Sequence, residues 1–359
     1  MYLRDRIMKP NLFNAVVALL MTVATSALAE ESPTPAAALG RPSLQSPKAP
    51  RMAILTVANA GKRMLAAGER GIVIYSDDNG SNWTQAQTPT SASLTAMRFA
   101  NDHQGWAVGH MGIVLHTADG GRTWAKQLDG IEAARLTLDA ARKSGDERAI
   151  RDAERMVLDG ADKPFFDLCV IDDHTLFIVG AYNLAMRSDD GGKTWTAWQK
   201  HIANPRALHL YAMRAVGSSL FIAGEQGLLL RSSDGGQSFA PINSPYKGSW
   251  FGLVAERNGG LLAYGLRGNV YLTRDLGKTW KQANSATPVS ISAGTELADG
   301  RIVLVSQAGD VLISADKGLS FTRSPEKTGL PLASVAEGFD GLVLGSLRGV
   351  GFMPLPATN

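Results

Sequence analysis

The chain has 359 residues, of which 45% are hydrophobic and 19% charged, and its formal net charge is +3. Its single Cys excludes an intramolecular disulfide and every metal site that needs several cysteines. The small net charge gives no support to nucleic acid binding. The 38 glycines exceed the usual share of roughly 7% and indicate many tight turns between short strands.

Residues 1–29 are predicted to be a secretory signal peptide. A positively charged start is followed by a mainly apolar run at 12–24 and by a small-x-small cleavage site at Ala27–Ala29. The apolar run is too short to span a bilayer, although an uncleaved anchor is the alternative. Cleavage near Ala29 removes three positive charges and one negative, which takes the net charge from +3 to +1. We therefore expect a periplasmic or secreted protein with no transmembrane segment in its mature chain.

Residues 30–50 are rich in Pro, Ala and Ser and are predicted to be a linker, with a possible strand near 43–47.

An octapeptide of the form Ser/Thr-x-Asp-x-Gly-x-Ser/Thr/Asn-Trp/Phe then recurs along the chain. Four of its copies end in Trp, at Trp83, Trp124, Trp195 and Trp280, and two end in Phe. The aspartates of the six copies are Asp78, Asp119, Asp190, Asp234, Asp275 and Asp316. Four of the five Asp-to-Asp steps are 41 to 44 residues long, the period of a β-propeller blade.

Each repeat also carries an apolar strand that ends in Gly, a two-residue link and a second strand. Glycine-flanked links of this kind are typical of hairpin turns, because glycine supplies the positive φ that these turns need. Each unit therefore has strands A to D, with a tight B–C turn and the octapeptide as its C–D turn. Seven A-to-C cores are predicted, at 51–75, 92–116, 165–187, 208–231, 250–272, 290–313 and 332–353.

The sequence thus predicts an all-β, seven-bladed propeller over residues 51–356. Its seventh unit has no octapeptide, so its outer strand must come from elsewhere. Residues 43–47 are predicted to supply that strand and to close the ring, because an edge strand tolerates their prolines.

One step is 71 residues long, and residues 131–162 account for the excess. This segment is rich in Ala, Arg, Glu and Leu, with helical spacing on both sides of a break at Ser144–Glu147. It is predicted to be a helical hairpin inserted between blades 2 and 3.

The octapeptide resembles the Asp-box, or BNR repeat, of sialidases and of many non-enzymatic propellers. Short Asp and Ser/Thr side chains satisfy backbone N–H groups within such a turn, and the aromatic residue packs between strands. We therefore expect the six boxes to be structural, against the alternative that their carboxylates bind calcium or act in catalysis.

The B–C turns lie on the face opposite the boxes, where a partner is expected to bind. Arg70, Arg267 and Arg348 each directly precede the second Gly of a B–C turn, and guanidinium groups suit carboxylates and carbonyls of a partner. The alternative is three solvated arginines. Three further tip residues are candidates for partner binding: His110, Tyr182 and Glu225.

With its boxes, its Gly105–Gly109 strand end, its seven blades and its export signal, the chain resembles the photosystem II stability/assembly factor family. The resemblance runs from about residue 51 to 355. It implies a non-catalytic scaffold outside the inner membrane that holds a membrane-protein complex during assembly, with arginines on its binding face. No cofactor is implied, and we expect a monomer.

A sialidase-like glycoside hydrolase is the alternative function. Tyr182, Tyr211 and Tyr264 are the possible nucleophiles near the axis, and Glu69 and Glu225 lie on the same face. The spacing of these residues does not identify a catalytic set. The Arg-Ile-Pro triplet that usually opens such enzymes is also absent. The six His residues form no close ligand pairs, so no metal site is expected, and Cys169 is predicted to be a buried apolar residue.

Overall fold

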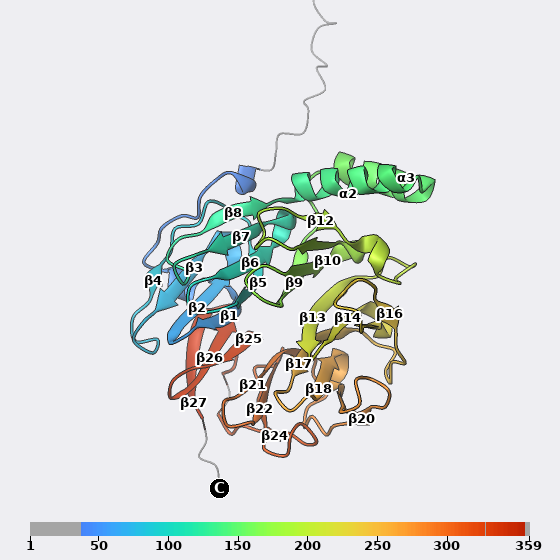
Figure 1. Ribbon diagram of the computed structural model, residues 1–359. Coiled ribbons are helices and arrows are strands. Elements are labelled where there is room, and N and C mark those ends of the chain that lie inside the picture. The colour runs from blue at the N-terminus through green and yellow to red at the C-terminus, as the bar shows by residue number, and fades with distance from the viewer. Residues whose placement is uncertain (1–36, 327, 356–359) are drawn as a thin grey trace, which may run out of the picture. The chain divides into compact units, whose positions relative to one another are not determined.

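Antiparallel sheets make up most of the computed structural model, which describes residues 37–326 and 328–355 (Figure 1). Within those residues the strands form six four-stranded sheets and one three-stranded sheet. The predicted signal peptide, residues 1–29, lies outside the described residues, and so do residues 30–36 of the linker.

Each sheet is built from strands that pair in chain order, A to D. The A strands are β1 Ile54–Ala60, β5 Leu94–Phe99, β9 Phe165–Val170, β13 Leu210–Val216, β17 Trp250–Ala255, β21 Ile291–Glu296 and β25 Leu332–Glu337. The B strands are β2 Arg63–Gly68, β6 Gly105–Gly109, β10 Leu176–Gly180, β14 Ser219–Gly224, β18 Leu261–Gly265, β22 Ile302–Ser306 and β26 Gly341–Ser346. The C strands are β3 Val73–Ser76, β7 Val114–Thr117, β11 Ala185–Ser188, β15 Leu229–Ser232, β19 Val270–Thr273, β23 Val311–Ser314 and β27 Gly349–Pro354. The D strands are β4 Thr84–Gln85, β8 Ala125–Leu128, β12 Thr196–Ala197, β16 Ala240–Pro241, β20 Lys281–Gln282 and β24 Thr322–Arg323.

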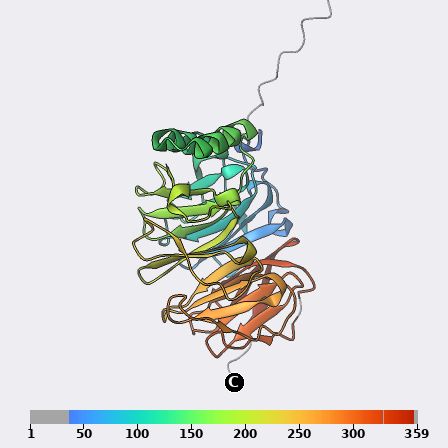
Figure 2. The same cartoon turned by 90° about the vertical axis from the view of Figure 1, so that its right-hand side faces the viewer.

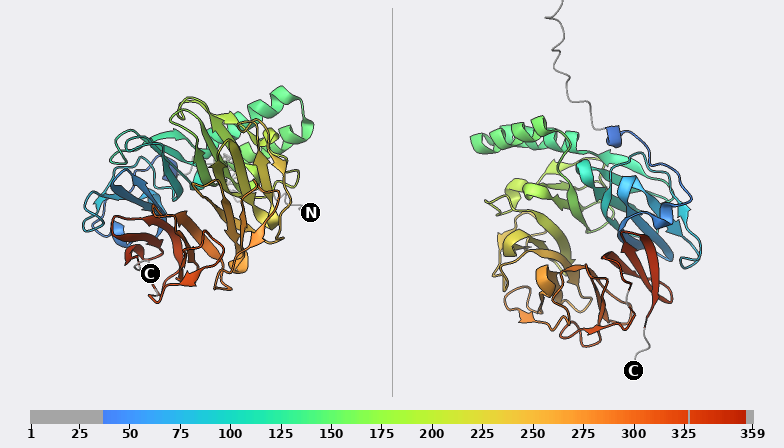
Figure 3. Two further views of the ribbon diagram at one scale, coloured as in Figure 1. Left: turned by 60° about the horizontal axis from the view of Figure 1, so that its bottom comes forward. Right: turned by 180° about the vertical axis from the view of Figure 1, so that it is seen from behind.

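The seven sheets are the blades of a propeller. A strands of successive sheets contact one another around a central axis, and β25 of the last sheet contacts β1 of the first. The ring is seen from two sides in Figures 1 and 3. The predicted all-β, seven-bladed propeller is confirmed.

Burial along the strands follows from this arrangement. Every residue of β6, β10, β18 and β22 is buried, although an exposed sheet would alternate buried and exposed residues. A blade packs between two neighbouring blades, so both of its faces are covered and the alternation is lost. Trp106, Phe165, Phe221 and Trp250 are the largest fully buried side chains of this core.

The predicted closure of the ring is wrong. Blade 7 has three strands within the described residues, and residues 43–46 bind to blade 1 instead. Ser43 N donates to Thr88 O (3.2 Å), and Ser46 N donates to the side-chain oxygen of Gln85 (2.9 Å). The segment therefore runs along the outer edge of blade 1 and enters β1 through the short 3₁₀ helix η2, Ala49–Arg51. The outer edge of β27 carries no fourth strand among the described residues.

The predicted helical insertion is present as α2 Gly130–Ser144 and α3 Glu147–Asp159. Each helix begins at an aspartate, Asp129 or Asp146, whose side chain accepts two backbone N–H groups of the first turn. α2 contacts β12 and the B–C turn of blade 2. In Figures 1 and 2 the hairpin lies outside the ring of sheets, beside blades 2 and 3. Among the described helices, none is long and apolar enough to cross a membrane.

Candidate partner-binding face and central channel

The six Asp-boxes have the hydrogen bonds expected of a structural turn. In the second box, Thr117 Oγ1 accepts from Gly121 N (2.9 Å), and Asp119 Oδ1 accepts from Thr123 N (3.0 Å). The other five repeat this pattern. Hydrogen bonds from Thr279 and Thr273 lower the pKa of the Asp275 carboxyl to about 2. Because the boxes use their carboxylates internally, the interpretation as structural turns is supported over calcium binding.

Trp124 and Trp195 of the boxes are buried, whereas Trp83 and Trp280 are half-buried.

Five of the B–C turns, at the opposite face, share one backbone conformation. They are single 3₁₀ turns: η3 Glu69–Gly71, η4 His110–Gly112, η5 Ala181–Asn183, η7 Glu225–Gly227 and η8 Leu266–Gly268. In each, a non-glycine middle residue lies in the left-handed region, with φ between 52° and 59°: Arg70, Met111, Tyr182, Gln226 and Arg267. The middle residue is thereby held at the tip of its turn in five different blades.

The first glycine of each turn is needed for a different reason than the sequence suggests. Gly68 has an extended φ of −173°, not a positive one. A Cβ at this position would lie 2.0 Å from the backbone oxygen of Ala53, the residue before strand A of the same blade. That oxygen accepts the Glu69 N–H at 3.0 Å. Glycine is therefore required by close approach of two backbone segments, and Gly109, Gly180, Gly224 and Gly265 have the same surroundings.

Hydrogen bonds tie four of these five turns to the next blade. The N–H of the middle residue donates to the side chain that precedes the next A strand. The pairs are Arg70 to Ser93 Oγ (3.3 Å), Tyr182 to His209 Nδ1 (2.9 Å), Gln226 to Ser249 Oγ (3.3 Å) and Arg267 to Ser290 Oγ (3.2 Å). The tips are therefore fixed in position relative to one another, while their side chains remain free to differ.

The three predicted arginines do not form one cluster. All three are exposed, but Arg348 lies in a tighter turn, where Ser346 pairs directly with Gly349 and no residue is left-handed except Gly349. Three residues separate the glycines here, against two around Arg70, so the predicted equivalence of Arg348 is wrong. Arg70 and Arg348 belong to neighbouring blades 1 and 7, whereas blade 6 separates Arg267 from both.

The other predicted tip residues are distributed as follows. Tyr182 is a middle residue with 61% of its surface exposed, and His110 is exposed at the first position of η4. Glu225 is half-buried, and its carboxylate accepts the His209 N–H (3.3 Å). Glu69 of blade 1 does the same for Ala53 N (3.0 Å). These two glutamates therefore hold the start of their own strand A.

A further ring of residues, which sequence reasoning missed, surrounds the axis below the turns. Each A strand contains a β-bulge at its second residue, where the register with strand B shifts. The seven bulge residues, here called the bulge ring, are Leu55, Thr95, Phe166, Tyr211, Phe251, Ser292 and Ala333. All seven line one central cavity of about 120 Å³.

Aromatic residues occupy the bulge ring in blades 3, 4 and 5. The Phe166 and Tyr211 rings lie 5.4 Å apart, and the Tyr211 and Phe251 rings 5.9 Å apart. His209 links this group to the tip residue Tyr182, with their rings 4.6 Å apart. Such tilted and edge-to-face contacts are the favoured aromatic geometries. An aromatic surface thus continues from the exposed face into the channel.

Deeper in the channel lies a charged group, here called the channel triad: Arg98, Asp167 and Arg214. Asp167 comes from blade 3, and the arginines come from the A strands of blades 2 and 4. Asp167 accepts from Arg214 Nη1, from Met213 N (3.0 Å) and, weakly, from Arg98 Nη2 (3.4 Å). One carboxylate therefore serves two guanidinium groups.

Tyr264 also reaches this cavity, although it comes from strand B. A Cβ on Gly252 of strand A would lie 2.0 Å from the Tyr264 hydroxyl, so the glycine opens the path for the ring. Burial raises the pKa of Tyr264 to about 12, and burial followed by the Glu225 charge raises that of Tyr211. Both shifts oppose formation of a phenolate nucleophile. The channel tyrosines therefore lack the activation that a sialidase-like mechanism needs.

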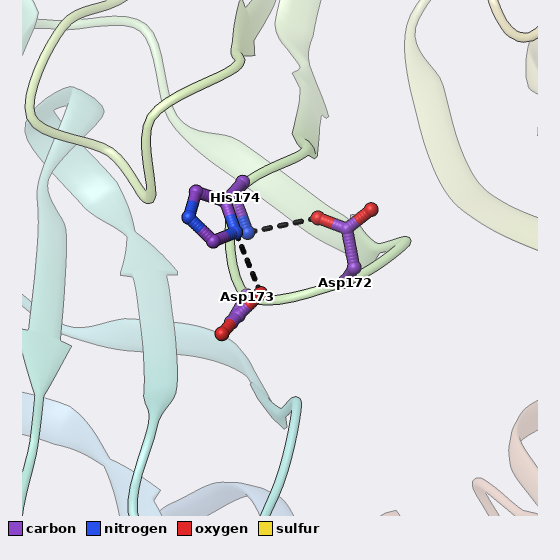
Figure 4. Close-up of side chains that lie close together, drawn as sticks. All are labelled: Asp172, Asp173 and His174. Carbon is purple, nitrogen blue, oxygen red and sulfur yellow. Dashed lines mark hydrogen bonds and ion pairs between the residues drawn. The ribbon is translucent and has the colours of Figure 1, made fainter.

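One group of possible metal ligands was found among the described residues: Asp172, Asp173 and His174 in the exposed β9–β10 turn (Figure 4). Asp172 Oδ1 accepts the N–H groups of His174 (2.8 Å) and Thr175 (2.7 Å), and His174 Nδ1 lies 2.7 Å from Asp173. The two bonds to Asp172 are those of an ordinary Asx turn. Cys169, as predicted, is buried, and burial raises its pKa to about 11.

Comparison with known proteins identifies the family. The family model described as photosynthesis system II assembly factor YCF48 matches residues 75–163 and 154–329, well over half of the chain. The chain belongs to this family. It is a non-catalytic propeller of the YCF48 assembly-factor kind, and the enzyme alternative is set aside. No curated protein matches the sequence.

Solved structures similar to this YCF48-family chain are propellers of low sequence identity. "YCF48 bound to D1 peptide" is 15% identical, covers 88% of this chain and 96% of its own, and gives a TM-score of 0.64. YCF48 from Cyanidioschyzon merolae is 14% identical, with coverages of 85% and 96% and a TM-score of 0.63. The WD40 propeller domain of Doa1 is 10% identical, with coverages of 88% and 95% and a TM-score of 0.63. At these identities the likeness establishes the fold.

Proposed function

We propose that this protein is an exported assembly factor that binds a membrane-protein complex of the cell envelope through its B–C face. The observation that carries the proposal is the family match, which spans blades 1 to 6. A solved YCF48 carries a D1 peptide, which makes a protein partner the natural expectation for this relative. The signal-like residues 1–29 support export.

The geometry of the two faces favours the B–C face. Its turn tips are held rigidly by interblade hydrogen bonds, yet they expose Arg70, Tyr182 and Arg267. Rigid scaffolds with variable exposed side chains are typical of binding surfaces. The Asp-box face uses its polar side chains within each turn. Arg348 and His110 are exposed at the same end of the blades and belong to the proposed surface, whereas Glu225 contributes only by holding its strand.

The test is affinity capture of partners from envelope extracts with the protein isolated from the periplasm. We expect the triple variant Arg70→Ala/Arg267→Ala/Arg348→Ala to lose most captured partner, because arginine forks contribute strongly to protein recognition. The isolated protein should also begin at Glu30, which peptide mass measurement checks.

The matched control carries the same number of charge deletions on the Asp-box face: Arg122→Ala/Lys193→Ala/Lys278→Ala. All three of these side chains are exposed in C–D turns. Identical capture by the two triple variants would refute the proposed face, and an uncleaved or cytoplasmic product would refute export.

A further inference from the structure

The central channel has the dimensions and walls of a binding site for one small group. Its cavity of about 120 Å³ opens among the bulge ring, below the B–C turns. An engineered protein cavity of about 150 Å³ accommodates benzene. The space therefore suits one aromatic or large apolar side chain and not a folded segment.

Two groups of residues within the bulge ring differ chemically. In blades 3 to 5 the ring residues are aromatic, whereas in blades 2 and 6 they are Thr95 and Ser292. The hydroxyls of Thr95 and Ser292 bind the first residue of the next A strand, at Phe165 O (2.8 Å) and Leu332 O (2.5 Å). Among the described residues, the side chains of Phe166, Tyr211 and Phe251 make no such bond, and all three line the cavity. Thr95 and Ser292 therefore hold blades together, and the three aromatic residues form an apolar wall; Leu55 and Ala333 complete the ring.

The cavity lining next to this apolar wall carries more positive than negative charge. The charged residues that line the cavity are the channel triad, with two guanidinium groups and one carboxylate. Asp167 is 5% exposed, and its oxygens are occupied by both arginines and by Met213 N. The single side-chain hydrogen bond of Arg98 found among the described residues is the 3.4 Å contact with Asp167.

Arg98 has one long ion pair, with Asp167, and 37% of its side chain is exposed to the channel. Burial, and then the nearby Arg214 charge, lower the pKa of Arg98 despite Asp167. An incoming anion would offset the charge of Arg214, the second of these effects. Glu225, whose charge acts on Tyr211 from the turns above, is already bonded to His209 N and belongs to the rim.

We propose that this channel binds a carboxylate that carries an aromatic or large apolar group. The carboxylate pairs with Arg98 and Arg214, and the apolar group packs against Phe166, Tyr211 and Phe251. The aromatic wall and the charged group are neighbours along the channel, because Asp167 directly follows Phe166 in β9.

This site is independent of the arginines at the turn tips and stands whether or not the B–C face binds a protein. Two kinds of ligand have this combination of a carboxylate and an apolar group: the carboxyl end of a protein that ends in an apolar residue, and a free aromatic acid. A carboxyl-terminal peptide enters the channel from the B–C side, whereas a free acid needs no further contact with the face.

The experiment is calorimetric titration of the purified protein with N-acetyl-L-phenylalanine and with its amide. We expect the acid to bind saturably and the amide to bind at least about tenfold more weakly, because the charge-assisted bonds are lost. The peptide Gly-Gly-Gly-Gly-Phe with a free carboxyl end distinguishes the sources. Binding of this peptide supports a protein terminus, and binding of N-acetyl-L-phenylalanine alone supports a free acid.

Two variants separate charge from packing. Arg98→Gln should weaken the acid about tenfold and leave the amide unchanged, since the amide carries no charge to lose. Phe251→Ser should weaken the acid and the amide by a similar factor. This second variant keeps the fold, because blade 6 already carries Ser292 at the same bulge. Arg231→Gln is the control, as Arg231 lies in an outer strand and binds Ser219 Oγ (3.1 Å).

Absence of saturable binding, or equal affinity for acid and amide, would overturn the proposal. So would an equal loss in Arg98→Gln and Arg231→Gln. If Arg98→Gln proves unfolded, the acid-to-amide ratio of the wild type and the result for Phe251→Ser still decide the question.

Discussion

The two ends of the propeller blades repeat in different ways. At the Asp-box end the residue types recur, and the side chains bond within their own turn. At the B–C end the backbone conformation recurs, while the middle residue is Arg, Met, Tyr, Gln or Arg. The Asp-box end, where the side chains repeat, therefore stabilises the fold. The B–C end, where only the backbone conformation repeats, can vary its side chains to suit a binding function.

The bulge ring extends this contrast into the channel. Seven bulges recur at one strand position, yet their residues range from alanine to phenylalanine. A bulge re-aims a side chain without requiring a particular one. The same backbone device thus serves interblade bonding at Thr95 and Ser292 and an apolar wall at Phe166, Tyr211 and Phe251.

The largest expected effect comes from the glycines of one blade. Gly224→Ala places a Cβ 2.3 Å from His209 O, a backbone atom, and should lower the free energy of unfolding by about 3 kcal/mol. Gly235→Ala in the Asp-box meets nothing within 4 Å and adds only strain from its φ of +69°, about 1 kcal/mol. Urea unfolding measures both. Equal losses would mean that the B–C turn does not depend on close backbone approach.

A smaller effect distinguishes side chains at the two ends. Asp119→Ala removes the acceptor for Arg122 N, Thr123 N and Thr123 Oγ1 and should cost about 2 kcal/mol of unfolding free energy. Arg267→Ala, at an exposed B–C tip, should change the stability by less than about 0.5 kcal/mol. A large loss for Arg267→Ala would show that the tip arginine is structural.

The effect of Asp119→Ala on the unfolding free energy should depend on pH. Although partial burial acts in the opposite direction, hydrogen bonds from Thr123 and Thr117 hold the pKa of Asp119 below its ordinary value. A carboxyl whose pKa is lowered by folding stabilises the native state above its unfolded pKa, and this contribution disappears as the pH falls through the folded pKa. The stability difference between wild type and Asp119→Ala should therefore shrink in strong acid, as measured by chemical unfolding across pH.

Sequence reasoning succeeded where residue types repeat. Six copies of one octapeptide at a period near 41 were enough for the blades, and the long step located α2 and α3. Sequence reasoning failed where the structure depends on the number of residues in a turn or on the backbone conformation of a single residue. An extra residue between Gly345 and Gly349 removes Arg348 from the shared turn, and an extended φ at Gly68 conceals a requirement for close approach.

The sequence did not predict the channel triad, for a different reason. Asp167 lies 69 residues from Arg98 and 47 from Arg214, on three strands that the packing of neighbouring blades brings together. No local pattern marks those positions. The predicted strand at 43–47 failed similarly, because the Gln85 side chain and Thr88 O on blade 1 provided partners that composition does not reveal.

The smallest expected effect tests an exception at the Asp-box end. Glu256, in the turn after β17, is buried; one oxygen lies 3.1 Å from Arg274 Nη1, and the other has no hydrogen-bond partner among the described residues. Burial raises the pKa of Glu256 despite the Arg274 charge. A carboxyl whose pKa is raised by folding favours the native state while it is protonated, and that contribution is lost as the pH rises from the unfolded to the folded pKa.

Glu256→Gln cannot ionise, so its melting temperature relative to wild type should rise by about 2 °C between pH 4 and pH 7. Asp139→Asn, a change in an exposed helical carboxylate paired with Arg135, is the control and should show no such rise. A fall for Glu256→Gln would mean that the ion pair with Arg274 outweighs the burial of the charge.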